Sequence, residues 1–261
     1  MSIRTKNWPA GVPCWVDLGT PEPTEDVRLY ADVLSWEVTD PGPEFGGYLT
    51  AHRGGSAAAG IGPAEGETVF WNVYVATDDV DATAAAVTAA GGRVLMGPGD
   101  VGPLGRMAIA ADPTGAQFGL WQAGTHIGAS LVNEPGGLVW EDLRSTDPDA
   151  SRAFFASVFG WAYEPMEGFP GYTTFSLPQE GLILGGIGPA GPETPGEAAG
   201  WLPYFGVDDT DAAVGAAEAR GAKVVMPAES TPYGRMAVLA DPRGAEFAVI
   251  ASDWSEQPDR S

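Results

Sequence analysis

Hydrophobic and polar residues alternate along residues 14–18, the first strand-like segment of the chain. A period of two places Val16 and Leu18 on one face of the predicted strand, and Trp15 and Asp17 on the other. Residues 20–34 then carry the signals of a helix: a capped start, acidic residues in the first turn and an apolar stripe. Short strand-like runs punctuated by glycine follow, so this stretch predicts a strand, a helix and further strands.

The same order restarts further along the chain. Residues 71–76 have the pattern of a strand, and Asp78 or Asp79 is placed to cap an alanine-rich helix at 80–90. Two glycines end that helix, and three more strand-like runs follow. The first half of the chain therefore predicts a β-α-β-β-β unit that occurs twice.

The second half repeats the first at an offset of about 125 to 130 residues. The matched pairs of segments are CWVDL (14–18) with VWEDL (139–143), LYADVLSW (29–36) with FFASVFGW (154–161), GIGP (60–63) with GIGP (186–189), 77–94 with 207–224, and 105–121 with 234–250. We therefore predict a first domain at 1–124, a connector rich in glycine and small residues at 125–135, a second domain at 136–254 and a C-terminal tail at 255–261.

Composition narrows the function classes. The 261 residues include 35 Asp and Glu against 13 Lys and Arg, a net charge of -22 that repels nucleic acids and anionic membranes. A single cysteine excludes an intramolecular disulfide, and the sequence carries neither a membrane-length apolar run nor a signal core, so we expect a cytoplasmic protein. Lysine occurs only at Lys6 and Lys223, while Ala, Gly, Pro and Arg are abundant, which indicates high-GC coding as in actinobacteria.

The repeated helix segments RLYADVLSW and RAFFASVFGW, with the closing segments DPTGAQFGLW and DPRGAEFAVI, resemble the vicinal oxygen chelate superfamily. That superfamily includes glyoxalase I, bleomycin-resistance proteins and extradiol dioxygenases, and the resemblance covers nearly all of residues 11–252. It implies an α+β fold in which four βαβββ units form two cups, with the helices outside and the ligand inside. Tandem duplication within one chain favours a monomer, with a homodimer as the alternative.

Metal-dependent members of the superfamily hold their ion with His, Gln or Glu on the first strand and Glu on the last strand of each unit. The resemblance places Trp15 and Trp140 at the first-strand ligand position, and Asn72 and Leu202 at the other first-strand position. The last-strand position falls on Gly119 and Ala248. Since a divalent ion needs three or four converging His or carboxylate ligands, we expect no metal site and no cofactor.

Strand parity points one carboxylate into each cup. Asp17 and Asp142 each follow an inward-facing tryptophan by two positions, and a buried carboxylate is costly unless it is paired or hydrogen-bonded. Two interpretations stay open. Either these aspartates bind ligand or act as general bases with raised pKa values, or they accept hydrogen bonds from the backbone or from Arg106 and Arg235.

The remaining candidates are mostly aromatic. Predicted to face inward are Trp15, Tyr48, Asn72, Tyr74 and Trp121 in the first copy, and Trp140, Tyr172 and Tyr204 in the second, with Met107 and Met236 as adaptable apolar walls. These side chains fill the core, or they line a site for a flat apolar ligand.

Other polar residues have simpler interpretations. His52 and His126 are predicted to be exposed loop residues. The Asp pairs 78/79 and 208/209 are placed to cap helices, and capping is favoured over cation binding.

These observations favour metal-independent binding of a small aromatic or polycyclic metabolite. Drug sequestration, self-resistance or an accessory role in antibiotic biosynthesis are the settings that the resemblance suggests. The alternatives are a glyoxalase-type lyase or dioxygenase with a metal held by unexpected groups, and a metal-free acid–base enzyme that uses Asp17 or Asp142 on an aromatic substrate. One cup could also bind while the other only supports it.

Overall fold

The structure is a computed structural model that describes residues 3–64, 66, 69–190 and 200–254. The elements of the first copy are β1 (Pro13–Thr20), α1 (Pro23–Leu34), β2 (Glu37–Thr39), the short 3-10 helix η1 (Pro43–Phe45), β3 (Leu49–Arg53), β4 (Ser56–Pro63), β5 (Phe70–Ala76), α2 (Val80–Ala89), β6 (Arg93–Asp100), β7 (Gly105–Ala111) and β8 (Gln117–Ala123).

The second copy repeats this order. Its elements are β9 (Leu138–Ser145), α3 (Pro148–Phe159), β10 (Ala162–Pro165), β11 (Thr173–Leu177), β12 (Leu182–Pro189), β13 (Gly200–Gly206), α4 (Thr210–Ala219), β14 (Lys223–Thr231), β15 (Gly234–Ala240) and β16 (Glu246–Ala251). The predicted α+β architecture of four βαβββ units is confirmed.

Each copy forms its own eight-stranded sheet, in the order β2-β3-β4-β1-β5-β8-β7-β6 and β10-β11-β12-β9-β13-β16-β15-β14. The two units of a copy meet where β1 pairs antiparallel with β5, and where β9 pairs antiparallel with β13. Units one and two therefore build one cup, and units three and four build the other. We call the inner faces of these sheets cup one and cup two.

Side-chain capping fixes where α2 and α4 begin, whereas the capped start predicted for α1 was wrong, because its N-cap residue Glu22 makes no side-chain cap hydrogen bond. The side chain of Asp79 accepts a hydrogen bond from the backbone N–H of Ala82 at the start of α2, and Asp209 does the same for α4. These bonds use the second aspartate of each Asp pair, which confirms the predicted capping role.

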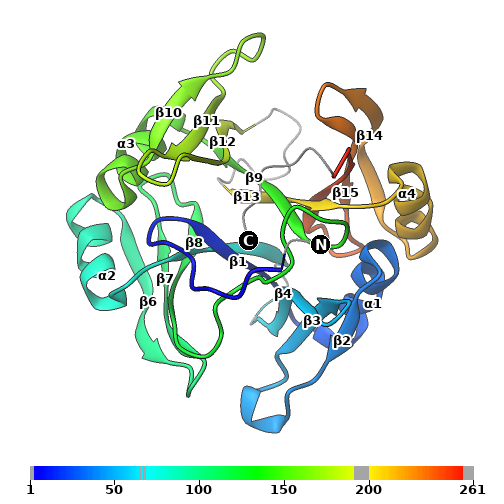
Figure 1. Ribbon diagram of the computed structural model, residues 1–261, viewed down its shortest axis with the longest axis horizontal. Helices are drawn as coiled ribbons and strands as arrows, with labels where there is room; N and C mark the ends of the chain where they lie inside the picture. Colours follow the sequence, from blue (N-terminus) through cyan, green and yellow to red (C-terminus); the bar gives the residue numbers. More distant parts are fainter. Residues whose placement is uncertain (1–2, 65, 67–68, 191–199, 255–261) are drawn as a thin grey trace.

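The helices lie outside the cups, as predicted, and meet in pairs between the two copies. Helix α1 contacts α4 and α2 contacts α3, on opposite flanks of the molecule (Figure 1). Trp36, just after α1, donates its indole N–H to the carbonyl of Gly136 at 2.7 Å, and Trp161, just after α3, donates to Gly11 at 2.7 Å. Each copy thus makes a tryptophan hydrogen bond to the segment that precedes the first strand of the other copy.

One apolar core runs through both copies. On the α1 and α4 flank, Tyr30 of α1 packs on Trp71 and Phe247, and on the α2 and α3 flank Phe118 of β8 packs on Phe155 of α3. The Tyr30 hydroxyl also donates to Asp241 of the opposite copy at 2.9 Å. The two copies therefore pack as an internal pair, and none of the helices in the described ranges is long and apolar enough to span a bilayer.

Candidate functional site

Cup one contains a hydrogen-bonded network around the carboxylate of Asp17 on β1. The hydroxyls of Tyr74 and Tyr48 donate to Asp17 Oδ2 at 2.9 and 3.2 Å, and the indole N–H of Trp15 donates to the Tyr48 hydroxyl at 2.9 Å. Burial raises the pKa of Asp17 to about 6, while the bonds from Tyr74, Tyr48 and Asn72 oppose that rise. Strand parity predicted this face correctly, and the tyrosines satisfy the buried carboxylate.

Two glycines make room for these tyrosine rings. A Cβ atom at Gly60 would lie 1.8 Å from the Tyr48 hydroxyl oxygen, and one at Gly119 would lie 2.0 Å from Cδ1 of Tyr74. Gly119 is the residue that the resemblance places at the last-strand ligand position. In this chain the Tyr74 ring lies over that position, so cup one is filled by its own aromatic residues.

The segment after β8 closes cup one. The His126 ring lies edge-on to Trp15 at a centroid distance of 4.6 Å and also contacts Trp121 at 5.5 Å. Trp121 donates its indole N–H to the His126 carbonyl at 2.8 Å, and the His126 N–H donates to the Leu104 carbonyl at 3.1 Å. Burial lowers the pKa of His126 to about 4, with a smaller contribution from the charge of His52. The predicted exposure of the two histidines was wrong, because both are partly buried. His126 lies in a loop as predicted but packs on the cup, and His52 lies within β3.

Cup two repeats the network in a more open form. Asp142 Oδ1 accepts hydrogen bonds from the Trp140 indole at 2.9 Å and the Tyr172 hydroxyl at 2.6 Å, and Oδ2 accepts one from the Tyr204 hydroxyl at 2.8 Å. All four side chains are only partly buried, whereas Trp15, Asp17 and Tyr74 of cup one are buried. Burial, reinforced by the charge of Asp142, raises the pKa of both tyrosines, so they remain hydrogen-bond donors at neutral pH.

The inner faces also include the predicted methionines. On β7, Met107 pairs with Trp121. On β15, Met236 pairs with Ile250 and lies two positions before Val238, whose pair with Ala248 faces the cup. Both methionines are partly buried. In cup two, Leu202, Val238 and Ala248 form an apolar cluster separate from the main core, with Tyr204 and Met226 packed against it.

Neither candidate arginine reaches the aspartates. Arg106 pairs with Asp81 and Asp100, and Arg235 pairs with Asp211. The suggestion that these arginines hydrogen-bond to Asp17 and Asp142 was wrong. Met107 and Met236 face the cups, and each arginine is the preceding residue of its strand, so it lies on the opposite face and pairs with an aspartate of the neighbouring helix.

Sequence reasoning missed an ion pair in cup two. Arg144 on β9 shares the face of Trp140 and Asp142 and pairs with Glu246 of β16. The aligned repeats contained the signal, since Gly19 and Gln117 occupy these two positions in the first copy. The charge of Arg144 opposes the rise in the pKa of Tyr204.

The residues at the superfamily's metal positions do not fit a metal. Indole nitrogens of Trp15 and Trp140 donate hydrogen bonds and offer no lone pair, and the Asn72 carbonyl oxygen accepts from Gln117 at 3.1 Å. Gly119, Leu202 and Ala248 provide no ligand atom. Within the described ranges no three His, Cys, Asp or Glu side chains converge as a metal site would require.

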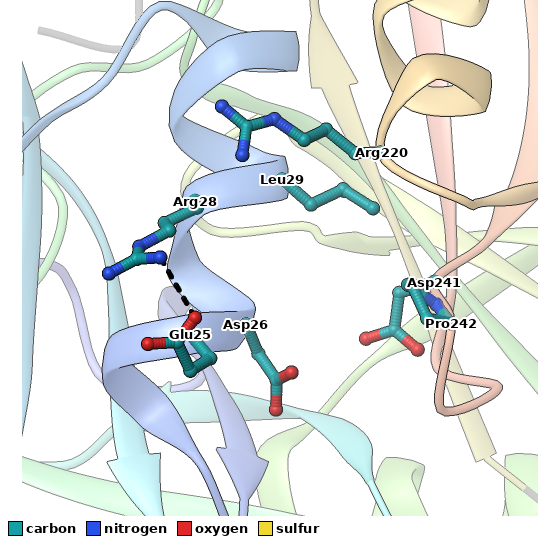
Figure 2. Close-up of a pocket in the computed structure, with 7 residues that line it drawn as sticks. All are labelled: Glu25, Asp26, Arg28, Leu29, Arg220, Asp241 and Pro242. Atoms are coloured by element: carbon teal, nitrogen blue, oxygen red, sulfur yellow. Dashed lines mark ion pairs between the residues drawn. The ribbon is translucent and has the colours of Figure 1, made fainter.

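A cavity of about 150 Å³ lies between α1 and the end of α4, outside both cups (Figure 2). Most of its charged residues are ion-paired: Arg28 with Glu25, Asp26 with Arg243, and Arg220 with Asp32. Asp241 accepts a hydrogen bond from the Tyr30 hydroxyl. A second cavity of about 140 Å³ lies beside Trp8 and Trp121, at the edge of cup one. The first of these cavities is therefore a feature of the packing between the copies.

Both copies match known families. Residues 15–120 match the family described as "Glyoxalase/Bleomycin resistance protein/Dioxygenase superfamily", and residues 140–250 match the family described as "Glyoxalase-like domain". The chain belongs to the glyoxalase, bleomycin-resistance and dioxygenase superfamily as a tandem of two such domains. This confirms the resemblance found in the sequence.

Particular relatives span nearly the whole chain. It is 42% identical to CFP32 of Mycobacterium tuberculosis, provisionally named a glyoxylase, over 92% of this chain and 94% of that protein. It is 36% identical to the anthracycline biosynthesis protein DnrV of Streptomyces peucetius, over 92% and 93%. The fold resembles the Mn(II)-bound glyoxalase of Novosphingobium aromaticivorans with a TM-score of 0.65 at 17% identity, covering 93% of this chain and 82% of that one.

Proposed function

We propose that this protein binds a small aromatic or polycyclic metabolite without a metal ion. The observation that carries the proposal is the network of Asp, Tyr, Tyr and Trp that stands in each cup where metal-dependent relatives hold their ion. Indole and phenol rings provide flat apolar surface, and their polar atoms fix a ligand's orientation. Such a site is built for recognition of a planar molecule.

The relatives support a particular setting. Two proteins matched over most of their length, DnrV of Streptomyces peucetius and DauV of a Streptomyces strain, are named anthracycline biosynthesis proteins. An accessory role in antibiotic biosynthesis, or self-protection by sequestering the compound, fits a cup that binds an aromatic metabolite and does no metal chemistry on it. We propose that the protein acts in the cytoplasm.

A titration tests this proposal. Protein dialysed against a chelator is assayed for Ni, Zn, Mn and Fe by elemental analysis, then titrated by calorimetry with a panel of polyketide and glycopeptide metabolites. We expect micromolar binding of at least one compound, with the same affinity before and after chelation. Binding to none of them, or binding that returns only when a metal is restored, contradicts the proposal.

One observation favours a second candidate, a metal-free acid–base enzyme. The pKa of Asp17, raised to about 6 by burial, lies where a carboxyl group exchanges protons at neutral pH. If this is the function, Asp17→Asn or Asp142→Asn abolishes turnover of the bound metabolite while binding is preserved. Retention of turnover in both variants excludes it.

A further inference from the structure

We infer that cup two, not cup one, takes the ligand, and that the ligand is a planar aromatic molecule with a hydroxyl group beside a carbonyl group. This inference rests on the proposed function and specifies its site. It follows from three differences between cups that otherwise repeat each other: their access, their mouths and their polar ends.

Access differs because the connector closes only one cup in the described part of the chain. Trp15 is 5% exposed, Asp17 8% and Tyr74 5%, and their core is continuous with that of the molecule. The tip of the β6–β7 hairpin is hydrogen-bonded to the start of the connector and the residue before it. The Leu104 carbonyl accepts hydrogen bonds from the N–H groups of Gly124 and His126. A ligand can enter cup one only after these bonds and the His126 ring contacts have been broken.

The mouth of cup two exposes aromatic side chains. Tyr233, at the β14–β15 hairpin tip where cup one has Leu104, is 61% exposed, and Phe169 is 59% exposed. Phe169 lies beside Tyr172 of the network, with its ring 6.4 Å from the Tyr172 ring. Grouped exposed aromatic residues at a cup's edge are typical of a binding site for an apolar surface.

The polar ends of the cups, by which we mean the ends at Gly19 in cup one and at Arg144 in cup two, differ most. In cup one, Gly19 stands opposite Phe70, and a Cβ atom at Gly19 would lie 3.2 Å from the Phe70 ring, so an aromatic ring covers this end. In cup two the corresponding pair is Arg144 and Gly200, and no described atom lies within 4 Å of a Cβ built at Gly200. Among the described residues, cup two thus has a guanidinium where cup one has a phenyl ring.

The hydrogen-bonding capacity left in cup two defines the ligand. A carboxylate accepts about four hydrogen bonds, and Asp142 already accepts three, from Trp140, Tyr172 and Tyr204, which leaves it able to accept one more. A guanidinium has about five N–H donors, and among the described residues Arg144 gives one to Glu246. A ligand that donates a hydroxyl to Asp142 and accepts at a carbonyl from Arg144 satisfies both groups, while its rings lie against Trp140 and Tyr172.

The test uses two planar probes of the same ring size. The first is 1,4-dihydroxyanthraquinone, which carries the hydroxyl and carbonyl pair, and the second is 9,10-dimethylanthracene, which carries neither. Each is titrated by fluorescence into wild type, Arg144→Met, the double variant Arg144→Met/Glu246→Gln and the cup-one control Gln117→Met. The double variant leaves no unpaired charge, so it keeps the test valid if Arg144→Met alone folds poorly.

We expect wild type to bind the quinone more tightly than the hydrocarbon. Both Arg144 variants should weaken quinone binding by about 10- to 100-fold and leave hydrocarbon binding within about twofold, since only the charged hydrogen bond is lost. Gln117→Met should bind both probes like wild type.

Two outcomes overturn the inference and differ in what else they affect. Quinone affinity that is unchanged in the Arg144 variants, or lost in Gln117→Met, refutes the choice of cup two while the proposed function stands. Failure of wild type to bind either probe or any metabolite of the calorimetric panel refutes the proposed function together with the inference.

Discussion

Replacing Asp17 by asparagine should change how the free energy of unfolding depends on pH. Burial raises the pKa of Asp17 to about 6 from an ordinary 3.8, so between these values the folded protein holds a proton that the unfolded chain releases. Stability from this group is therefore present at low pH and is lost as the pH rises from about 4 to above 6. Each pKa unit corresponds to about 1.4 kcal/mol, so the loss is about 3 kcal/mol.

Urea unfolding of wild type and Asp17→Asn at pH 4 and pH 7.5 measures this loss. The amide does not ionise, so the free energy of unfolding of the variant, minus that of wild type, should increase by about 2–3 kcal/mol between the two pH values. Any fixed cost of the substitution cancels in this comparison, as do the other titrating groups that both proteins share. A carboxyl-carbon NMR titration of Asp17 gives the pKa directly.

A second variant tests the cause that we assign. The Tyr74 hydroxyl donates to Asp17 at 2.9 Å and favours the charged carboxylate. Tyr74→Phe should therefore raise the pKa of Asp17 further. A stability difference that is the same at both pH values, or a fall in this pKa in Tyr74→Phe, would refute the reasoning that burial governs the Asp17 network.

Three further predictions test the closure of cup one and the packing of the copies. His126 has its pKa lowered to about 4 by burial, so its own contribution to stability should fall by about 2–3 kcal/mol as the pH drops from 6.5 to 4. In the same urea assay, the free energy of unfolding of His126→Gln, minus that of wild type, should therefore rise by this amount between pH 6.5 and pH 4, and an unchanged difference contradicts this. Gly119→Ala should cost about 1–3 kcal/mol in urea unfolding because its Cβ meets the Tyr74 ring, and an unchanged midpoint would show that the ring moves freely. Trp161→Phe removes the 2.7 Å bond to Gly11 and should cost about 1–3 kcal/mol in thermal unfolding, as should Trp36→Phe at the equivalent position, and unequal costs would contradict their equivalence.

Much of the fold was predictable because it rests on periodicity and repetition. Period-two alternation along β1 placed Trp15 and Asp17 on the inner face, and the repeated segments gave four units in the observed order. The helix caps were equally local, since an aspartate before a helix bonds to an N–H three residues on. These features depend on neighbours in sequence, so the sequence alone revealed them.

The missed features depend on contacts between distant residues. That His126 packs on Trp15 follows from the path of the connector across the cup, and that path leaves no periodic signal. The partners of Asp17 are tyrosines from β5 and from the segment before β3, which meet only when the sheet closes. Arg144 and Glu246 are 102 positions apart and differ from their counterparts in the first copy, so comparison of the repeats at cup-facing positions is the signal that would have found them.

The most direct test of the account is a crystal structure of chelator-treated protein soaked with 1,4-dihydroxyanthraquinone. We expect ligand density in cup two, with a carbonyl oxygen within hydrogen-bond distance of Arg144, a hydroxyl facing Asp142 and no metal between ligand and protein. Density in cup one beside Trp15, or a ligand held through a residual metal ion, would contradict it.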